Sequence, residues 1–257
     1  MLKIGKTEVV GFEAAIRSMH NPMRSWGRSD SGICPNGTEF GYCYLDHRKY
    51  CPRQNTDDPS FCIGPNDLDL LIRIRNSDAD NRDFMRMVVV YFDAIAPLYW
   101  WKEFGPCKAE TVVSSCSIIH QIVDRGIKLD DFSCENLTTE EFNNAYKSID
   151  ILNTYRWVYN NYEQIKKGEI PICKEIRPFI NTMDKKEIER QMIQLLPSSY
   201  NWKRTLMLNY AVLMNIYISH KSHELNEWKD FCNWIEDLPY SELITGKEKN
   251  NAENRKN

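Results

Sequence analysis

The sequence predicts an α+β protein that is rich in helices and has a small central sheet. Several segments carry apolar residues at helical spacing, and the segment that follows Thr138 is the clearest of them. The segment 84–92 has a β-branched centre and is bounded by Asp83 and Asp93, which is typical of a strand. With 257 residues, of which 42% are apolar, the chain can bury a sizeable core.

The first half of the chain mixes strands, helices and one long irregular stretch. We expect a strand or turn from residue 7 that runs into a short helix ending near residue 20. Residues 21–64 have no sustained period and are rich in Gly, Pro, Asn, Asp, Ser and Cys, so we interpret them as an insertion. The later elements expected here are a helix over 67–75, the strand over 84–92, and helices over 94–103 and 112–123.

The second half is predicted to be almost entirely helical. Thr138 is the expected N-cap of a helix over 139–165, with Glu141 three residues later. The aromatic stripe of this helix favours a core or an oligomer interface. Further helices are expected over 185–196, 205–219 and 226–236. We therefore expect a single domain over 1–245, with a cysteine-rich insertion at about 21–64 and a disordered tail over 246–257.

Charge and hydropathy exclude several classes of protein. The formal net charge of −3 gives no general attraction to nucleic acid or to an anionic membrane, so we expect neither as a partner. No apolar run reaches the roughly 18 residues that a membrane helix needs. The first residues contain no apolar signal core. We therefore expect a cytoplasmic protein.

Four of the nine cysteines gather in the insertion. Together with the intervening His47 they are candidate zinc ligands, although the short Cys-x2–4-Cys spacing of structural zinc sites does not occur. Unpaired thiols are the alternative, and a disulfide would require oxidising conditions. The four candidate ligands are Cys34, Cys43, Cys51 and Cys62.

Two distant segments, 96–104 and 196–209, resemble the active-site segments of flavin-dependent thymidylate synthases. The family has the signature Arg-His-Arg-x-x-Ser-x-Asn-Glu after a strand and the opening of a helix. Here Lys102, Glu103 and Phe104 stand at Arg-His-Arg, and Glu110 matches the glutamate. In the second segment, Leu196-Pro and Asn209 match the family's Leu-Pro and Asn in spacing. The resemblance covers roughly residues 66–238.

The resemblance implies a flavin-dependent thymidylate synthase-like fold that binds FAD and dUMP and forms a tetramer with sites between subunits. The family transfers a methylene group to C5 of dUMP and reduces it with flavin. Independently, a helix beginning near Asn201, with Ser198 and Ser199 as possible caps and the basic pair Lys203 and Arg204 at its start, could bind phosphate, or could be an ordinary capped helix. The candidate ligand-binding residues are Lys102, Glu103, Glu110, Ser114, Ser115, Ser198, Arg204 and Asn209.

Several positions depart from the family's pattern. Phe104, Ser114, Ile193 and Ala211 stand where the family has arginines, and these losses weaken the expected grip on the phosphates of FAD and dUMP. We therefore expect a divergent protein that binds a nucleotide or related phosphate ligand, with weak or no classical methyl transfer. An active FAD-dependent thymidylate synthase with a rearranged site and a protein-interaction module are the alternatives.

Overall fold

The computed structural model describes residues 1–33, 61–77, 82–107, 111–171 and 183–247. Within it the chain forms two compact units. The first, here called the α6 unit, comprises Met1–Lys3, Ala94–Gly105 and Ser114–Arg204. The second, the α10 unit, comprises Ile4–Asp93, Pro106–Val113 and Thr205–Asn257. The expectation of one domain over 1–245 stays a prediction.

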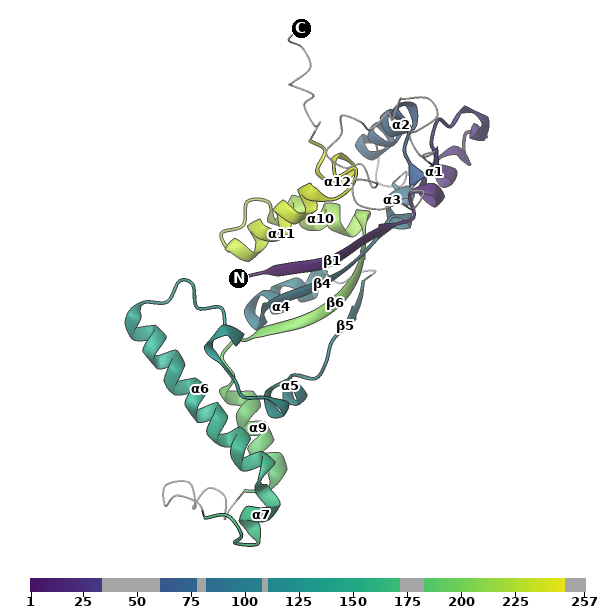
Figure 1. The fold of residues 1–257 in the computed structure, drawn as a ribbon. Coiled ribbons are helices and arrows are strands. Elements are labelled where there is room, and N and C mark those ends of the chain that lie inside the picture. Colours follow the sequence, from purple (N-terminus) through teal and green to yellow (C-terminus); the bar gives the residue numbers. More distant parts are fainter. Residues whose placement is uncertain (34–60, 78–81, 108–110, 172–182, 248–257) are drawn as a thin grey trace, which may run out of the picture. The chain divides into compact units, whose positions relative to one another are not determined.

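The central sheet has four strands in the order β1-β4-β6-β5 (Figure 1). A second sheet pairs β2 with β3 in antiparallel fashion, with Gly32 opposite Cys62. The small sheet and the many helices confirm the predicted α+β class. The strands are β1 (Lys3–Val10), β2 (Gly32–Ile33), β3 (Phe61–Cys62), β4 (Val89–Pro97), β5 (Val112–Ser114) and β6 (Asn201–Asn209).

Most of the predicted helices are confirmed, although several begin at other residues. The α-helices are α1 (Phe12–His20), α2 (Pro65–Asn76), α3 (Asp83–Met87), α4 (Leu98–Phe104), α5 (Ile118–Asp124), α6 (Thr139–Asn160), α7 (Tyr162–Lys166), α9 (Lys185–Leu195), α10 (Tyr210–His220), α11 (Asn226–Asp237) and α12 (Glu242–Thr245). Short 3-10 turns cover Trp26–Arg28, Gly105–Cys107 and Leu129–Asp131.

Three boundaries predicted between residues 84 and 123 are wrong. The segment 84–92 is not one strand, because it begins as helix α3 and becomes strand β4 only at Val89. Strand β4 then continues to Pro97, so the predicted helix over 94–103 begins at Leu98. The predicted helix over 112–123 divides into β5 and α5. In β4 buried residues alternate with less buried ones. Ile95 is an apolar residue at a less buried position, so the two-residue period is not visible in the sequence.

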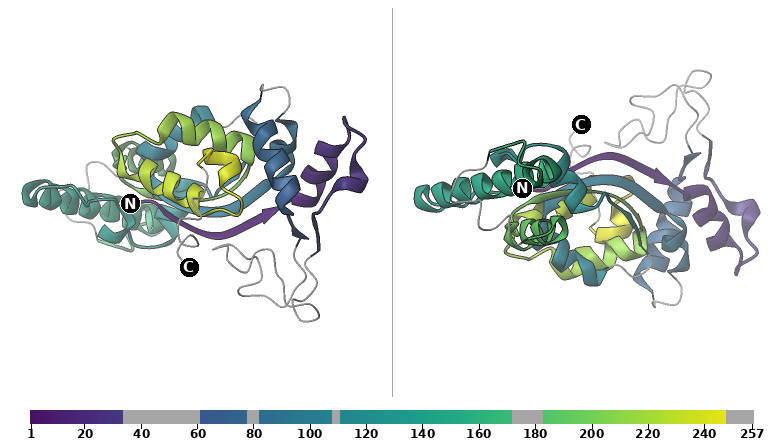
Figure 2. Two further views of the ribbon diagram at one scale, coloured as in Figure 1. Left: turned by 90° about the horizontal axis from the view of Figure 1, so that it is seen from above. Right: turned by 90° about the horizontal axis from the view of Figure 1, so that it is seen from below.

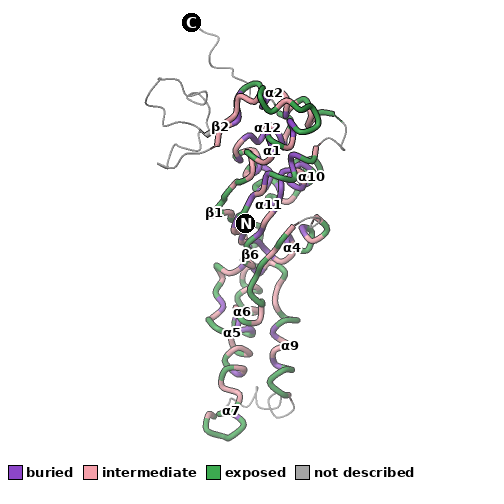
Figure 3. The backbone as a smooth tube through the Cα atoms, turned by 90° about the vertical axis from the view of Figure 1, so that its right-hand side faces the viewer, coloured by how far each residue is buried: buried purple, intermediate pink, exposed green. Residues whose placement is uncertain are grey.

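The α6 unit is built on a helical pair. Helices α6 and α9 pack together, and their buried positions alternate with exposed ones (Figure 3). The hydroxyl of Thr138 accepts the Glu141 N–H at 3.3 Å, which confirms the predicted cap. A reciprocal capping box between Asp184 and Glu187 begins α9. Residues such as Leu152 and Met192 fill the core between the two helices.

The core of the α10 unit is the group of C-terminal helices. Helices α10, α11 and α12 contact one another and lie together in both views of Figure 2. Helix α10 buries most of its residues, among them Leu213 and Tyr217. Helix α1 packs against α3, where Gly11 has a φ of 101° and a Cβ would collide with the Met87 carbonyl oxygen. Only glycine fits this approach without strain.

A buried polar network joins α1, the following turn and α2. The Asp67 carboxylate bonds His20 Nε2 at 2.9 Å and accepts the hydroxyls of Ser29 and Ser31, each at 2.6 Å. The other ring nitrogen of His20 lies 2.7 Å from Ser25 Oγ. Asp67 and His20 are only 2% and 3% exposed, so the network fixes the path of the chain from α1 to residue 31.

The long insertion is described only at its two ends. Residues 34–60, which include Cys34, Cys43 and Cys51, lie outside the described part of the chain. No helix in the described ranges combines the length and the apolar character that crossing a membrane requires.

Candidate functional site

The first half of β6 places an arginine beside a tryptophan. Side chains two residues apart in a strand point to the same face, so Trp202 and Arg204 are neighbours. The guanidinium carbon of Arg204 lies 3.9 Å from the centroid of the Trp202 ring. This distance is well inside the roughly 6 Å limit of a cation–π contact.

Helix α4 supplies a second aromatic ring to the same guanidinium. The Trp101 ring centroid lies 4.4 Å from the guanidinium carbon of Arg204. Trp101 is 2% exposed and donates its indole N–H to the Trp202 carbonyl oxygen at 2.9 Å. The indole N–H of Trp202 is in turn bonded to the Cys116 carbonyl oxygen at 3.0 Å. Both rings are thus held in place, and we call Trp101, Trp202 and Arg204 the tryptophan–arginine cluster.

The charge of Arg204 has no counterion among the described residues. Its Nε–H is buried and has no hydrogen-bond acceptor there, and no described carboxylate forms an ion pair with it. Burial lowers the pKa of Arg204, but arginine remains protonated in proteins at neutral pH. Two aromatic faces offset part of the desolvation cost of the cation, and an anion would offset more. The cluster is therefore chemically suited to an anionic group.

Most of the predicted ligand-binding residues belong to the α6 unit, as the cluster does. Lys102 and Glu103 are exposed residues of α4, directly after Trp101. Ser114 ends β5, and both Ser114 and Ser115 are exposed just before Cys116, whose carbonyl oxygen binds Trp202. These four residues therefore belong to the two segments that are hydrogen-bonded to Trp202, which are α4 and the residues at the end of β5.

Ser198 does not cap a helix, which corrects the prediction of a helix beginning near Asn201. The chain from Asn201 to Asn209 is strand β6, and the turn before it binds the start of α4 through backbone atoms. The Tyr99 N–H donates to the Ser198 carbonyl oxygen at 3.1 Å, and the Leu98 N–H donates to the Tyr200 carbonyl oxygen at 3.0 Å. Ser198 thus helps to position α4 through its backbone.

Asn209 also differs from its expected place inside a long helix. It is the N-cap of α10, and its side-chain oxygen accepts the Val212 N–H at 2.9 Å. Asn209 belongs to the α10 unit, whereas Arg204 belongs to the α6 unit. Glu110 lies outside the described residues. The cluster therefore includes Arg204 alone of the eight predicted ligand-binding residues.

The described residues offer no metal site. Among them no group of three or more His, Cys, Asp or Glu side chains converges, and Cys62 is half-buried at the end of β3. The other three candidate zinc ligands are not described, so zinc in the insertion stays a prediction.

The residues at the family's arginine positions are not suited to binding the phosphates of flavin and substrate. Phe104, at an expected arginine position, is fully buried and stacks on Trp100 with ring centroids 5.1 Å apart. Ile193 and Ala211, at two other such positions, provide no charge on α9 and α10. A buried phenylalanine ring has no donor for a phosphate, so this position cannot replace the arginine of the family.

Two aromatic members of the cluster were missed as functional residues. Trp101 lies within the predicted helix over 94–103, and Trp202 lies at the start of the helix predicted near Asn201. The usable signal was the order Trp202-Lys-Arg204, because in a strand it places a ring and a cation on one face. Recognising it requires the correct assignment of β6.

The fold is similar to solved thymidylate synthases. One is the structure of thymidylate synthase X (ThyX) from Helicobacter pylori with FAD and dUMP, with a TM-score of 0.56, 13% identity, and coverage of 95% of this chain and 97% of that chain. A second structure of the flavin-dependent ThyX from Helicobacter pylori, complexed with FAD and dUMP, has a TM-score of 0.55, 12% identity and the same coverages of 95% and 97%. No protein-family model and no curated protein matches the sequence. At this identity the likeness shows the fold alone, and the chain has the predicted ThyX-like fold.

Proposed function

We propose that the protein binds a nucleotide or related phosphate ligand at the tryptophan–arginine cluster and has weak or no classical methyl-transfer activity. The observation that carries the proposal is Arg204, a partly buried cation between Trp101 and Trp202 that has no carboxylate partner among the described residues. The neighbours of similar fold hold FAD and dUMP, which supports a nucleotide as the ligand class.

The energetics favour a phosphate as the group that Arg204 binds. Arginine offers a planar fork of N–H donors that matches phosphate, and charge-assisted bonds are about twice as strong as neutral ones. The two indole rings hold the guanidinium in one orientation, which reduces the entropy lost on binding. Lys102, on the exposed side of α4, would add a second positive charge near the ligand.

An active thymidylate synthase with a rearranged site is the alternative, and Arg204 is the observation that favours it. In that case Lys102 and Arg204 would replace the missing arginines, and FAD would be the cofactor. The buried Phe104 argues against a flavin-binding site of the family's kind, because it stands where the family has an arginine. Flavin retained by the protein purified from cells would be visible in its absorbance spectrum.

Titration with dUMP tests the proposal. Arg204→Gln should weaken dUMP binding by about 30-fold, because losing a charged hydrogen bond costs roughly 2 kcal/mol. Lys203→Gln is the matched control, since it removes the same charge one residue away on the other face of β6. Isothermal calorimetry would show a small effect for Lys203→Gln. Equal affinities for the wild type and the Arg204 variant would contradict the proposed site.

We also propose that the protein self-associates, in keeping with the tetramer implied by the resemblance. Trp100 and Trp101 are buried within the α6 unit and so do not supply the surface for self-association. The exposed apolar residues of α6 and α9 are better candidates, and they are Tyr146, Ile151, Trp157, Ile193 and Leu195.

Light scattering after size-exclusion chromatography would measure the assembly. The expected mass is a multiple of 30.3 kDa, and Ile193→Glu with Leu195→Glu should lower it by placing charge in the interface. Arg190→Glu, at an exposed residue of α9, is a control for altered charge. A monomer at tens of micromolar wild-type protein would contradict self-association. The cytoplasmic location stays a prediction.

A further inference from the structure

The segment 17–28 differs in charge from the rest of the chain. It contains Arg17, Arg24 and Arg28 and no acidic residue, whereas the whole chain has a formal net charge of −3. All three arginines are exposed, and none forms an ion pair with a described residue. Asp30 is the first acidic residue after this segment, and its carboxylate accepts hydrogen bonds from the backbone N–H groups of Asn66 and Asp67 at the start of α2. The segment is therefore a local basic surface on an acidic protein.

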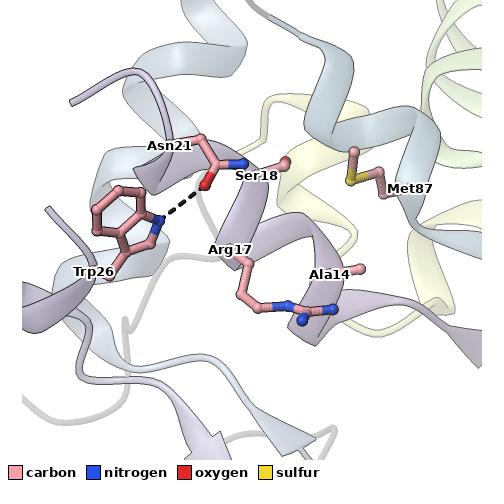
Figure 4. A pocket seen from close by; sticks show the side chains of 6 residues that line it. All are labelled: Ala14, Arg17, Ser18, Asn21, Trp26 and Met87. Atoms are coloured by element: carbon pink, nitrogen blue, oxygen red, sulfur yellow. Dashed lines mark hydrogen bonds between the residues drawn. The ribbon is translucent and has the colours of Figure 1, made fainter. Parts of the chain in front are cut away.

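A hollow opens on this surface next to an exposed aromatic ring. It has a volume of about 350 Å³ and is lined by Ala14, Arg17, Ser18, Asn21, Trp26 and Met87 (Figure 4). Trp26 is 55% exposed, and its indole N–H donates to Asn21 Oδ1 at 2.9 Å. The lining contains one cation and no acid, so the hollow combines a flat apolar ring with a positive charge.

Hydrogen bonds to buried residues fix the backbone of this basic segment. Ser25, directly before Trp26, is bonded to the buried ring of His20, and Ser29 and Ser31 are bonded to Asp67. These contacts fix both ends of the turn that carries Trp26 and Arg28. A ring that is exposed yet fixed in orientation loses little entropy when it stacks on a ligand.

Arg24 adds an unusual backbone conformation. Its φ is 48°, in the left-handed region that residues other than glycine rarely adopt. Backbone of this kind persists where the surroundings enforce it and is concentrated at functional sites. Here the Arg24 N–H donates to the Asn21 carbonyl oxygen at 3.2 Å, and the Ser25 N–H donates to the His20 carbonyl oxygen at 3.2 Å. The turn thereby places an arginine on the exposed surface before Trp26.

We infer that the segment 17–28 binds single-stranded nucleic acid, with one base stacked on Trp26 at the hollow and successive phosphates bound by Arg17, Arg24 and Arg28. Aromatic stacking beside a basic track is the general chemistry of such sites, and it tolerates any base sequence. The negative charge of the whole chain does not prevent this, because salt screens charges farther away than about 8 Å at physiological ionic strength.

The arrangement favours a strand over a free nucleotide. Only Arg17 lines the hollow, whereas Arg24 and Arg28 lie outside its lining. A mononucleotide would use the hollow and one arginine, and the other two cations would have no ligand. A strand provides a phosphate for each cation and an unpaired base for the ring.

Fluorescence anisotropy with a fluorescein-labelled 20-mer of dT, and with one of U, tests the inference. Three phosphate contacts predict a slope of log K against log salt of about −2, hence roughly ten- to twenty-fold weaker binding at 200 mM than at 50 mM salt. Arg24→Gln with Arg28→Gln should reduce the slope to about −0.7. Trp26→Ala should weaken binding on the order of 10-fold and leave the slope unchanged.

Matched controls are available on the same protein. Arg73→Gln removes an exposed arginine of α2, and Tyr91→Ala removes an exposed aromatic ring of β4; neither should change the affinity or the slope. A duplex of the same length should bind more weakly, because its bases are not free to stack. No anisotropy change at 100 μM protein, equal binding of duplex and strand, or displacement of the strand by an equal nucleotide concentration of UMP would each overturn the inference. Circular dichroism would verify that the variants are folded.

Discussion

Expression of this chain in a strain that lacks thymidylate synthase should not allow growth without thymidine. The positions that carry arginines in the resembling family hold Phe104, Ser114, Ile193 and Ala211 here. Removing one preorganised donor from an active site typically costs about 100- to 1000-fold in rate, so the loss of several should reduce dTMP formation below detection. The measurement is growth together with dTMP formation by the purified protein.

The Helicobacter pylori ThyX provides the positive control, since its fold is similar and its structures hold FAD and dUMP. If the strain that expresses this chain grew without thymidine, the proposal of weak or no methyl-transfer activity would be wrong. Lys102→Ala and Arg204→Ala would then identify the substitute cations, because each should abolish that growth if the site has been rearranged around them.

Replacing Asp67 by alanine should destabilise the protein by about 3 kcal/mol or more. The change leaves the Ser29 and Ser31 hydroxyls and the buried His20 ring without their acceptor, and breaking a buried pair of this kind costs roughly 3–5 kcal/mol. Urea denaturation would measure the loss. The control is Asp69→Ala on the same helix, because Asp69 is 68% exposed and its ion pair with Arg73 contributes less than about 1 kcal/mol. Equal stability of the two variants would contradict the role of Asp67.

The same network predicts a dependence on pH. Burial raises the pKa of Asp67, but hydrogen bonds from Ser29, Ser31 and His20 outweigh this, so the pKa lies below its usual value of 3.8. The unfolded chain then binds the proton more readily than the folded protein does, and stability falls as the pH drops through the folded pKa. The stabilisation is fully present above about pH 5 and is lost progressively below it. In Asp67→Ala this part of the acid dependence should disappear.

Helices with clear local signals could be predicted from the sequence. Thr138 with Glu141 gave the start of α6, and the apolar spacing after Asn226 gave α11. Caps and amphipathic periods are local, so a single sequence contains them. The overall α+β class followed from the same local patterns.

Strand β6 could not be predicted, because its sequence runs into α10 without a break. The apolar residues from Leu206 to Ile218 form one continuous pattern, yet the chain changes from strand to helix at Asn209. Pairing with β4 and β5 in the sheet determines that change, and such long-range pairing leaves no local signal. Arg204 was therefore predicted as a ligand-binding residue, but at the start of a helix instead of between two indole rings.

The most direct test of the central proposal is the NMR signal of the Arg204 Nε–H. In the described structure this group is buried without an acceptor, so it should respond when an anion reaches the guanidinium. Arg204→Lys would assign the signal by removing it. Addition of dUMP should shift the signal in a saturable manner, and uridine, which lacks the phosphate, should not. A signal that stays unchanged at millimolar dUMP would contradict a phosphate site at the tryptophan–arginine cluster.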